Sequence, residues 1–115
     1  MEVTLSVLKA DIGSVGGHTA PSRRVLAQVE AVVREAVGRL LLDAYTFHIG
    51  DDIVLLMSHT RGPRHPEVHA LAWRAFQKGT AVAKEEGLYG AGQDLLKDAF
   101  TGNLHGLGPQ VAEMT

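Results

Sequence analysis

The chain has 115 residues, of which 45% are hydrophobic and 21% are charged, and it contains no cysteine. A chain of this length closes one modest hydrophobic core, so we expect residues 1–115 to form a single domain. The net charge of -2 argues against nucleic acid or an anionic membrane as a partner, and the missing cysteines exclude disulfides and thiolate metal sites. No apolar run approaches the ~20 residues that span a bilayer, which favours a soluble, cytoplasmic protein.

The first predicted strand runs to about Lys9. In it the apolar residues Val3, Leu5 and Val7 alternate with the polar residues Glu2, Thr4 and Ser6, the period of two expected of a strand with one buried face. DIGSVGGHT follows over residues 11–19, and its three glycines predict a loop that bends sharply or approaches a ligand closely. Ser22 is the expected N-cap of a helix that ends at Gly38. The apolar stripe of this helix consists of Val25, Val29, Val32, Val33 and Ala36.

Residues 39–48 and 53–58 are both strand-like, and only residues 49–52 separate them, which predicts a β-hairpin. His65 and Pro66 predict the start of a second helix, which Gly87 closes. The inner face of this helix is expected to comprise Val68, Leu71, Ala72, Ala75, Gly79, Val82 and Ala83. A second glycine-rich loop, GLYGAG, then precedes a short helix predicted over residues 93–100, and the tail is expected to be irregular.

The order of elements predicts an α+β fold with a mainly antiparallel sheet of three strands and helices on one face. Because the hairpin strands are apolar at consecutive positions, both of their faces should be covered. We therefore expect the second face of the sheet to pack on another sheet or another chain.

Asp51 and Asp52 stand between two of the most apolar runs of the chain. Turn formation at the tip of a hairpin accounts well for Gly50 and Asp51. It accounts less well for the second carboxylate, because two like charges at the start of a strand repel unless a cation lies between them. A divalent ion would remove this repulsion.

Asp11 ends the first strand, and His18 lies at the far end of the glycine-rich loop. Considered alone, each residue has a simpler interpretation: Asp11 as a turn or cap residue, and His18 as a solvated imidazole in a loop. If the hairpin tip adjoins the end of the first strand, three carboxylates and one imidazole converge on one sheet edge, a hard, oxygen-rich set suited to Mg²⁺. The backbone N–H groups of the two glycine-rich loops add a possible phosphate site, which suggests a phosphorylated substrate.

Five segments that cover nearly the whole chain resemble the archaeal and thermophile type of fructose-1,6-bisphosphate aldolase/phosphatase. These segments are LSVLKADIGSVGGHT, HIGDDIVLLMSHTRG, EVHALAWRAF, GLYGAGQDLLKDAFTGN and GPQVAEM. The resemblance implies a Mg²⁺-dependent enzyme of gluconeogenesis that condenses two triose phosphates through a Schiff base and then hydrolyses the bisphosphate to fructose 6-phosphate. It also implies α-β-β-α layers and a homo-oligomer.

Carried over by motif, the resemblance implies that Asp11 is a metal ligand and the proton acceptor in phosphate hydrolysis. His18 would touch both metal and substrate, and Asp51 and Asp52 would hold neighbouring Mg²⁺ ions. Gln93 would be a further metal ligand. Three residues would contact the substrate, namely Tyr89, Gly102 and Asn103.

The Schiff-base lysine of this family, its tyrosine partner and further aspartate ligands lie beyond the region that is matched. We therefore expect residues 1–115 to be an N-terminal part of a longer enzyme, without aldolase activity and with incomplete Mg²⁺ sites. One alternative is a non-catalytic module of the same fold class that binds a small ligand or forms oligomers. Another is a zinc site at His59, His65 and His69, because the last two lie four residues apart at a helix start.

Overall fold

The computed structural model describes residues 2–11, 21–87 and 110–115. Within these ranges the elements are β1 (Thr4–Asp11), α1 (Arg23–Arg34), β2 (Asp43–Ile49), β3 (Asp52–His59), α2 (Pro66–Glu85) and β4 (Gln110–Met114). The predicted α+β class and the order strand, helix, strand, strand, helix are confirmed. The short helix predicted over residues 93–100 lies outside the described residues. Neither described helix is long and apolar enough to cross a membrane.

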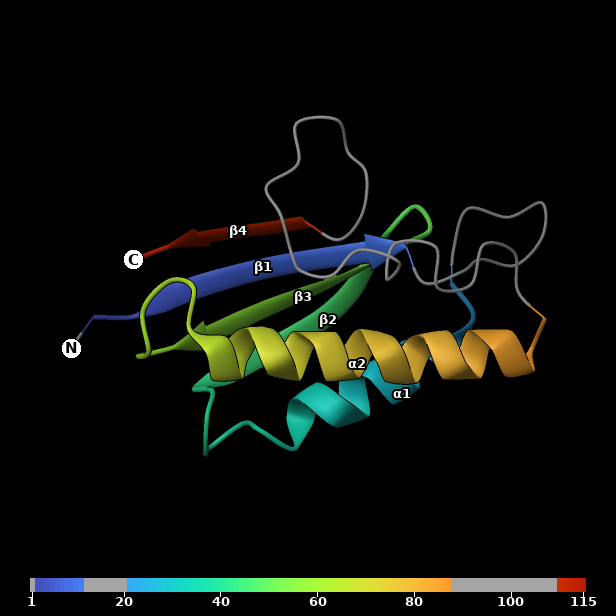
Figure 1. Cartoon of the computed structure of the whole chain (residues 1–115), viewed down its shortest axis with the longest axis horizontal. Helices are drawn as coiled ribbons and strands as arrows, with labels where there is room; N and C mark the ends of the chain where they lie inside the picture. Colours follow the sequence, from blue (N-terminus) through green and yellow to red (C-terminus); the bar gives the residue numbers. More distant parts are fainter. Residues whose placement is uncertain (1, 12–20, 88–109) are drawn as a thin grey trace.

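The four described strands form one antiparallel sheet in the order β2-β3-β1-β4, and α1 and α2 lie together against one of its faces (Figure 1). The expectation of three strands and an irregular tail was wrong, because Gln110–Met114 pairs with β1 as a fourth strand. This segment is only five residues long and follows a stretch rich in glycine and proline, so no local pattern marks it as a strand. Its backbone is instead satisfied by the free edge of β1, which is distant in the sequence.

The core lies between the helices and the sheet face that they cover. β1 and β3 each contribute alternate residues to it, so the period of two predicted for β1 is present. The expected buried face of β1 was wrong, because Thr4 and Ser6 are buried while Val3 and Leu5 are 40% and 39% exposed. The buried side chains from the sheet include Leu8, Ala10, Ala44, Ile53, Leu55 and Met57, and those from the helices include Val25, Val29, Val33, Val68, Leu71, Ala75 and Phe76. Ser22 and His65 are the N-caps of α1 and α2, as predicted.

Two predicted boundaries near the end of α1 were wrong. The helix ends at Arg34, and Gly38 lies in the following turn with a positive φ of 89°. β2 begins at Asp43 rather than at residue 39, because Leu40 and Leu41 fold back under the end of the helix. Both of their backbone N–H groups donate to the carbonyl of Ala36, and both side chains are buried. An apolar run therefore belongs to a buried turn here and not to a strand.

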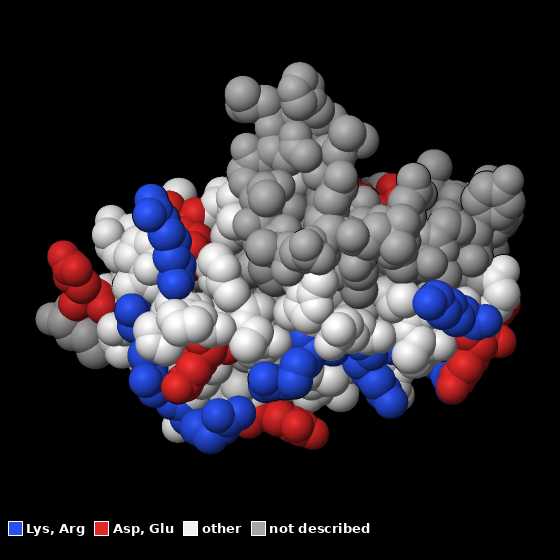
Figure 2. All heavy atoms as spheres, in the orientation of Figure 1, with Lys and Arg blue, Asp and Glu red and all other residues white. Residues whose placement is uncertain are grey.

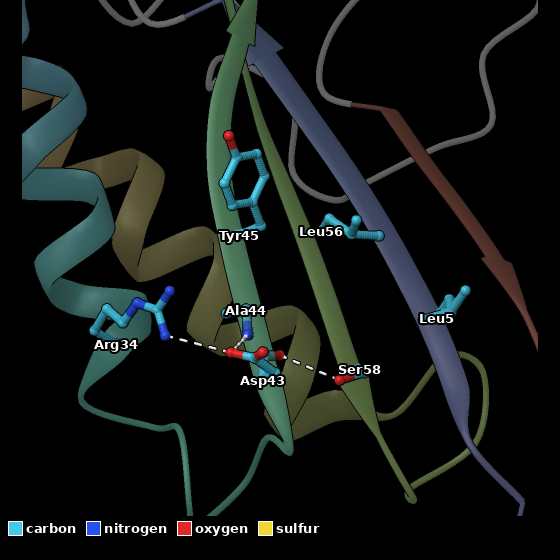
Figure 3. A pocket seen from close by; sticks show the side chains of 7 residues that line it. All are labelled: Leu5, Arg34, Asp43, Ala44, Tyr45, Leu56 and Ser58. Atoms are coloured by element: carbon cyan, nitrogen blue, oxygen red, sulfur yellow. Dashed lines mark hydrogen bonds and ion pairs between the residues drawn. The ribbon is translucent and has the colours of Figure 1, made fainter.

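The second face of the sheet is the face opposite α1 and α2, and it carries Leu5, Tyr45 and Met114 with 39%, 62% and 62% of their surfaces exposed. An open pocket on this face is lined by residues of β1, β2 and β3 together with Arg34 of α1, which forms an ion pair with Asp43 (Figure 3). Over the helical side, by contrast, cationic and anionic side chains are interspersed (Figure 2). The packing of the second face on another sheet or chain stays a prediction.

A network of buried polar groups joins β4 to the rest of the sheet. The Nδ1 atom of His59 accepts the backbone N–H of Arg61 at 3.1 Å, so the proton of the neutral ring lies on Nε2, which donates to Ser6 Oγ at 2.9 Å. The Ser6 hydroxyl in turn donates to Glu113 Oε2 at 2.5 Å. Both Ser6 and His59 are fully buried. Each polar group in this network therefore has a hydrogen-bond partner.

The Glu113 carboxylate is the acceptor at which this network ends. Its Oε1 atom also accepts the backbone N–H of Arg64 at 2.9 Å and lies 3.0 Å from His69 Nε2 of α2. Burial raises the pKa of Glu113, but the hydrogen bonds from Ser6 and Arg64 outweigh it and hold the pKa below the usual 4.5. Burial also holds the pKa of His59 below its usual 6.5. Both groups therefore stabilise the folded state in the forms that are present near neutral pH.

We predict that acid weakens the fold through this network. Below about pH 6.5 the unfolded chain takes up a proton at His59 more readily than the folded chain does, and below about pH 4.5 the same holds for Glu113. The free energy of unfolding should therefore fall as the pH is lowered from 7 to 4, as measured by urea unfolding at a series of pH values. His59→Gln should flatten the fall between pH 6.5 and 5.

The exposed ring of His48 provides the matched control. His48→Gln should leave the fall in the free energy of unfolding between pH 6.5 and 5 close to that of the wild type. A pH dependence unchanged by His59→Gln would contradict the assignment.

Candidate metal centre

The pairing of β1 with β3 brings the first two carboxylates together. Its register runs from Thr4 opposite His59 to Asp11 opposite Asp52, so the last pair of the ladder consists of two aspartates. Because side chains alternate along a strand, Asp11 lies on the same face as Leu5, and Asp52 on the same face as Leu56. This is the second face of the sheet. β1 ends at Asp11, as expected for this residue, so Asp11 is part of the ladder.

The turn between β2 and β3 positions the third carboxylate. Ile49 and Asp52 form the last pair of the hairpin, which leaves Gly50 and Asp51 as its two loop residues. Gly50 adopts a positive φ of 59°, which glycine reaches without strain. The carbonyl of Gly50 lies 3.0 Å from His48 Nδ1 and can accept a hydrogen bond from that ring nitrogen. In Figure 1 the hairpin tip lies beside the arrowhead of β1.

The three carboxylates therefore converge at one edge of the sheet. One oxygen each from Asp11, Asp51 and Asp52 can be chosen such that all three lie within 4.8 Å of one another. All three residues are half-buried. Lys9 approaches the cluster from β1, where its Nζ atom lies 3.7 Å from Asp52 Oδ2. The adjacency between the hairpin tip and the end of β1, on which the predicted site depended, is present.

The donor set fits a hard divalent cation. Three carboxylate oxygens at this separation can converge on one ion, and half-burial leaves room for the waters that Mg²⁺ retains. Like charges this close raise the free energy of the site unless cations neutralise them. Lys9 contributes one positive charge at this cluster. The geometry therefore favours a divalent cation, with oxygen ligands of the kind that select Mg²⁺ over softer metals.

The other predicted site residues lie outside the described part of the chain. These are His18, Tyr89, Gln93, Gly102 and Asn103. Their roles as metal or substrate ligands stay predictions. These residues belong to two segments, 12–20 and 88–109. The residues just after the first segment contact those just before the second: Ser22 donates to Glu86 at 2.7 Å, and Arg24 forms an ion pair with Glu85 at 2.8 Å.

The alternative zinc site at three histidines gains no support from the geometry. His65 Nδ1 accepts the backbone N–H of Glu67 as an N-cap, His69 contacts Glu113, and His59 is engaged by Ser6 and Arg61. Within residues 2–11, 21–87 and 110–115, the one group of possible metal ligands that lies close enough together consists of Asp11, Asp51 and Asp52.

Lys9 is a residue of this site that the sequence reasoning missed. Its alternation with Asp11 along β1 would have placed it on the same face, but the pairing partner of Asp11 was unknown. His48 was missed for a similar reason, because its contact with Gly50 depends on the turn geometry.

Comparison with known proteins identifies the family. A family model described as fructose-1,6-bisphosphatase matches residues 2–115. The chain belongs to this family. The chain is 85% identical over 114 residues to the fructose-1,6-bisphosphate aldolase/phosphatase of Thermus thermophilus, and the match covers 99% of this chain and 31% of that protein.

Two archaeal relatives of this family carry the same name. That of Cenarchaeum symbiosum is 54% identical over 114 residues, with 99% of this chain and 30% of the relative covered. That of Methanocaldococcus jannaschii is 55% identical over 113 residues, with 98% of this chain and 29% of the relative covered. The chain therefore spans about 30% of the length of these family members.

Repulsion within the cluster gives a testable consequence. We predict that Asp51→Asn raises the free energy of unfolding by about 0.5–1 kcal/mol in EDTA at low ionic strength, because it removes one of three like charges. The gain should disappear in 1 M NaCl, where the Debye length is about 3 Å. Denaturant unfolding at both salt concentrations measures it. A loss of stability at low salt would show that the Asp51 charge is not repelled by its neighbours.

Proposed function

We propose that the chain carries the metal-binding edge of a Mg²⁺-dependent fructose-1,6-bisphosphate aldolase/phosphatase of gluconeogenesis. The observation that carries this proposal is the convergence of the carboxylates of Asp11, Asp51 and Asp52 at the end of the β1–β3 ladder. Membership of the fructose-1,6-bisphosphatase family supports the substrate class, a sugar bisphosphate. The names of the relatives support both halves of the activity.

The three aspartates would hold Mg²⁺, with His18 and Gln93 as further ligands. Bound Mg²⁺ would polarise the phosphoryl oxygens and neutralise charge on the leaving group. The protein's part is to keep three oxygens at a fixed separation. Asp11 and Asp52 lie on paired strands, and Asp51 lies in a two-residue turn. The carbonyl of Gly50 in this turn lies within hydrogen-bond distance of His48.

Asp11 is the proposed proton acceptor for the water that attacks the phosphate. It ends β1 at the sheet edge and is half-buried, so a water can reach its carboxylate while the backbone ladder fixes the position of the residue. Asp52 lies directly opposite and has Lys9 as a partner.

Substrate contacts are proposed for four residues in the glycine-rich segments. These are His18, Tyr89, Gly102 and Asn103. The condensation of triose phosphates through a Schiff base is proposed for the whole enzyme, since the residues of this chain include no counterpart of the nucleophilic lysine motif. The apolar second face of the sheet supports a homo-oligomer or a further sheet layer as its cover.

Calorimetric titration of the chain with Mg²⁺ and fructose 1,6-bisphosphate tests this proposal. We predict heat of binding for the bisphosphate that depends on Mg²⁺, and at least a tenfold loss of Mg²⁺ affinity in Asp51→Ala and in Asp52→Ala, because each removes one of few charged ligands. The matched control is Asp43→Ala, which removes an exposed carboxylate from the other end of the same sheet. This variant should bind Mg²⁺ as the wild type does.

The same titration separates the proposal from its main rival. Binding of the bisphosphate that persists without Mg²⁺ and is unaffected by Asp51→Ala and Asp52→Ala would contradict a metal-dependent phosphatase site. It would favour a non-catalytic module that binds a small ligand.

A further inference from the structure

Lys9 is a cationic partner of the carboxylate cluster. It stands two residues before Asp11 on β1, so both side chains emerge from the second face. Its Nζ atom lies 3.7 Å from Asp52 Oδ2, and the two side chains are 44% and 31% exposed. The contact is therefore an ion pair at the rim of the site and not a buried salt bridge.

The position of this ammonium group matters because it contacts one of the carboxylates that a cation would use. Asp52 contributes one of the three oxygen atoms that lie within 4.8 Å of one another, and Lys9 approaches that same carboxylate. A divalent ion beside Asp52 would stand within a few ångströms of the ammonium group, at which distance like charges repel even in a medium of high dielectric constant. The lysine stem is flexible, so the head group can move away.

We propose that Lys9 is a built-in counter-ion of the carboxylate cluster and that a divalent cation must displace its ammonium group from Asp52 to bind. The lysine thus lowers the repulsion among the three aspartates while no metal is bound, and it weakens the affinity for the metal. This inference rests on the proposed function, because it takes the cluster to be the metal site. It makes Lys9 a residue that positions Asp52 and sets the metal affinity, and not a ligand.

Mg²⁺ affinity of three lysine variants tests this role. We predict that Lys9→Met binds Mg²⁺ about threefold to tenfold more tightly than the wild type in calorimetry at low ionic strength, because one competing charge is removed. Lys9→Arg keeps the charge and should stay within about twofold of the wild type. Lys78→Met makes the same change in net charge at an exposed position of α2 and should also leave the affinity unchanged within about twofold.

Thermal unfolding in EDTA provides a second readout that needs no metal. Lys9→Met should lower the Tm by about 1–4 °C at low ionic strength, because a positive charge beside the three aspartates is lost. Saturating Mg²⁺ should remove this difference. Lys78→Met should show no such dependence on Mg²⁺.

The outcomes separate this inference from the proposed function. Equal Mg²⁺ affinity in the wild type and Lys9→Met, with both binding, would overturn the role of Lys9 and leave the metal site intact. An absence of Mg²⁺ binding in both proteins would overturn the metal site, and the displacement with it. Weaker Mg²⁺ binding by Lys9→Met would show that the lysine assists the metal and would also overturn the inference.

Discussion

Because β1 and β3 are hydrogen-bonded in one particular register, Asp11 and Asp52 are the last pair of their ladder and lie on the same face of the sheet. A slip of one residue would turn one of these side chains to the helical side, since residues alternate between faces along a strand. The register is held by the core, where Leu8, Leu55 and Met57 are fully buried between the sheet and the helices. The candidate site thus depends on hydrophobic packing that lies on the opposite face.

The two ends of the sheet have different chemistry. At the end near Asp11, half-buried carboxylates accumulate negative charge, with Lys9 as a partner. At the other end, a continuous series of hydrogen bonds joins β4 to β1 and to the start of α2. It runs through His59, Ser6 and Glu113. The first arrangement stores repulsion that a cation can relieve, and the second leaves each polar group satisfied. Unrelieved repulsion is expected of a candidate binding site, whereas satisfied polar groups are expected of a contact that holds the fold together.

Local sequence signals were sufficient for the existence and order of β1, the hairpin and both helices, because alternation and capping residues act within a few positions. They did not give the end of α1, which precedes Gly38, or the buried face of β1, where Thr4 and Ser6 are buried. They were insufficient for β4, whose pairing partner is distant in the sequence, and for Leu40 and Leu41, which the end of α1 buries in a turn. The meeting of Asp11 with Asp52 was a conditional hypothesis, because it depends on strand order and register. Lys9 and His48 depend on the same long-range geometry and were therefore missed.

The most direct test of this account is a crystal structure of the chain grown with Mn²⁺ in place of Mg²⁺, with anomalous diffraction used to locate the metal. The account predicts an anomalous peak at about 2.0–2.3 Å from oxygens of Asp11, Asp51 and Asp52 at the end of the β1–β3 ladder, with the ammonium group of Lys9 moved away from Asp52. An ordered site with no peak between these carboxylates at saturating Mn²⁺, or Asp11 turned away from the hairpin tip, would contradict it.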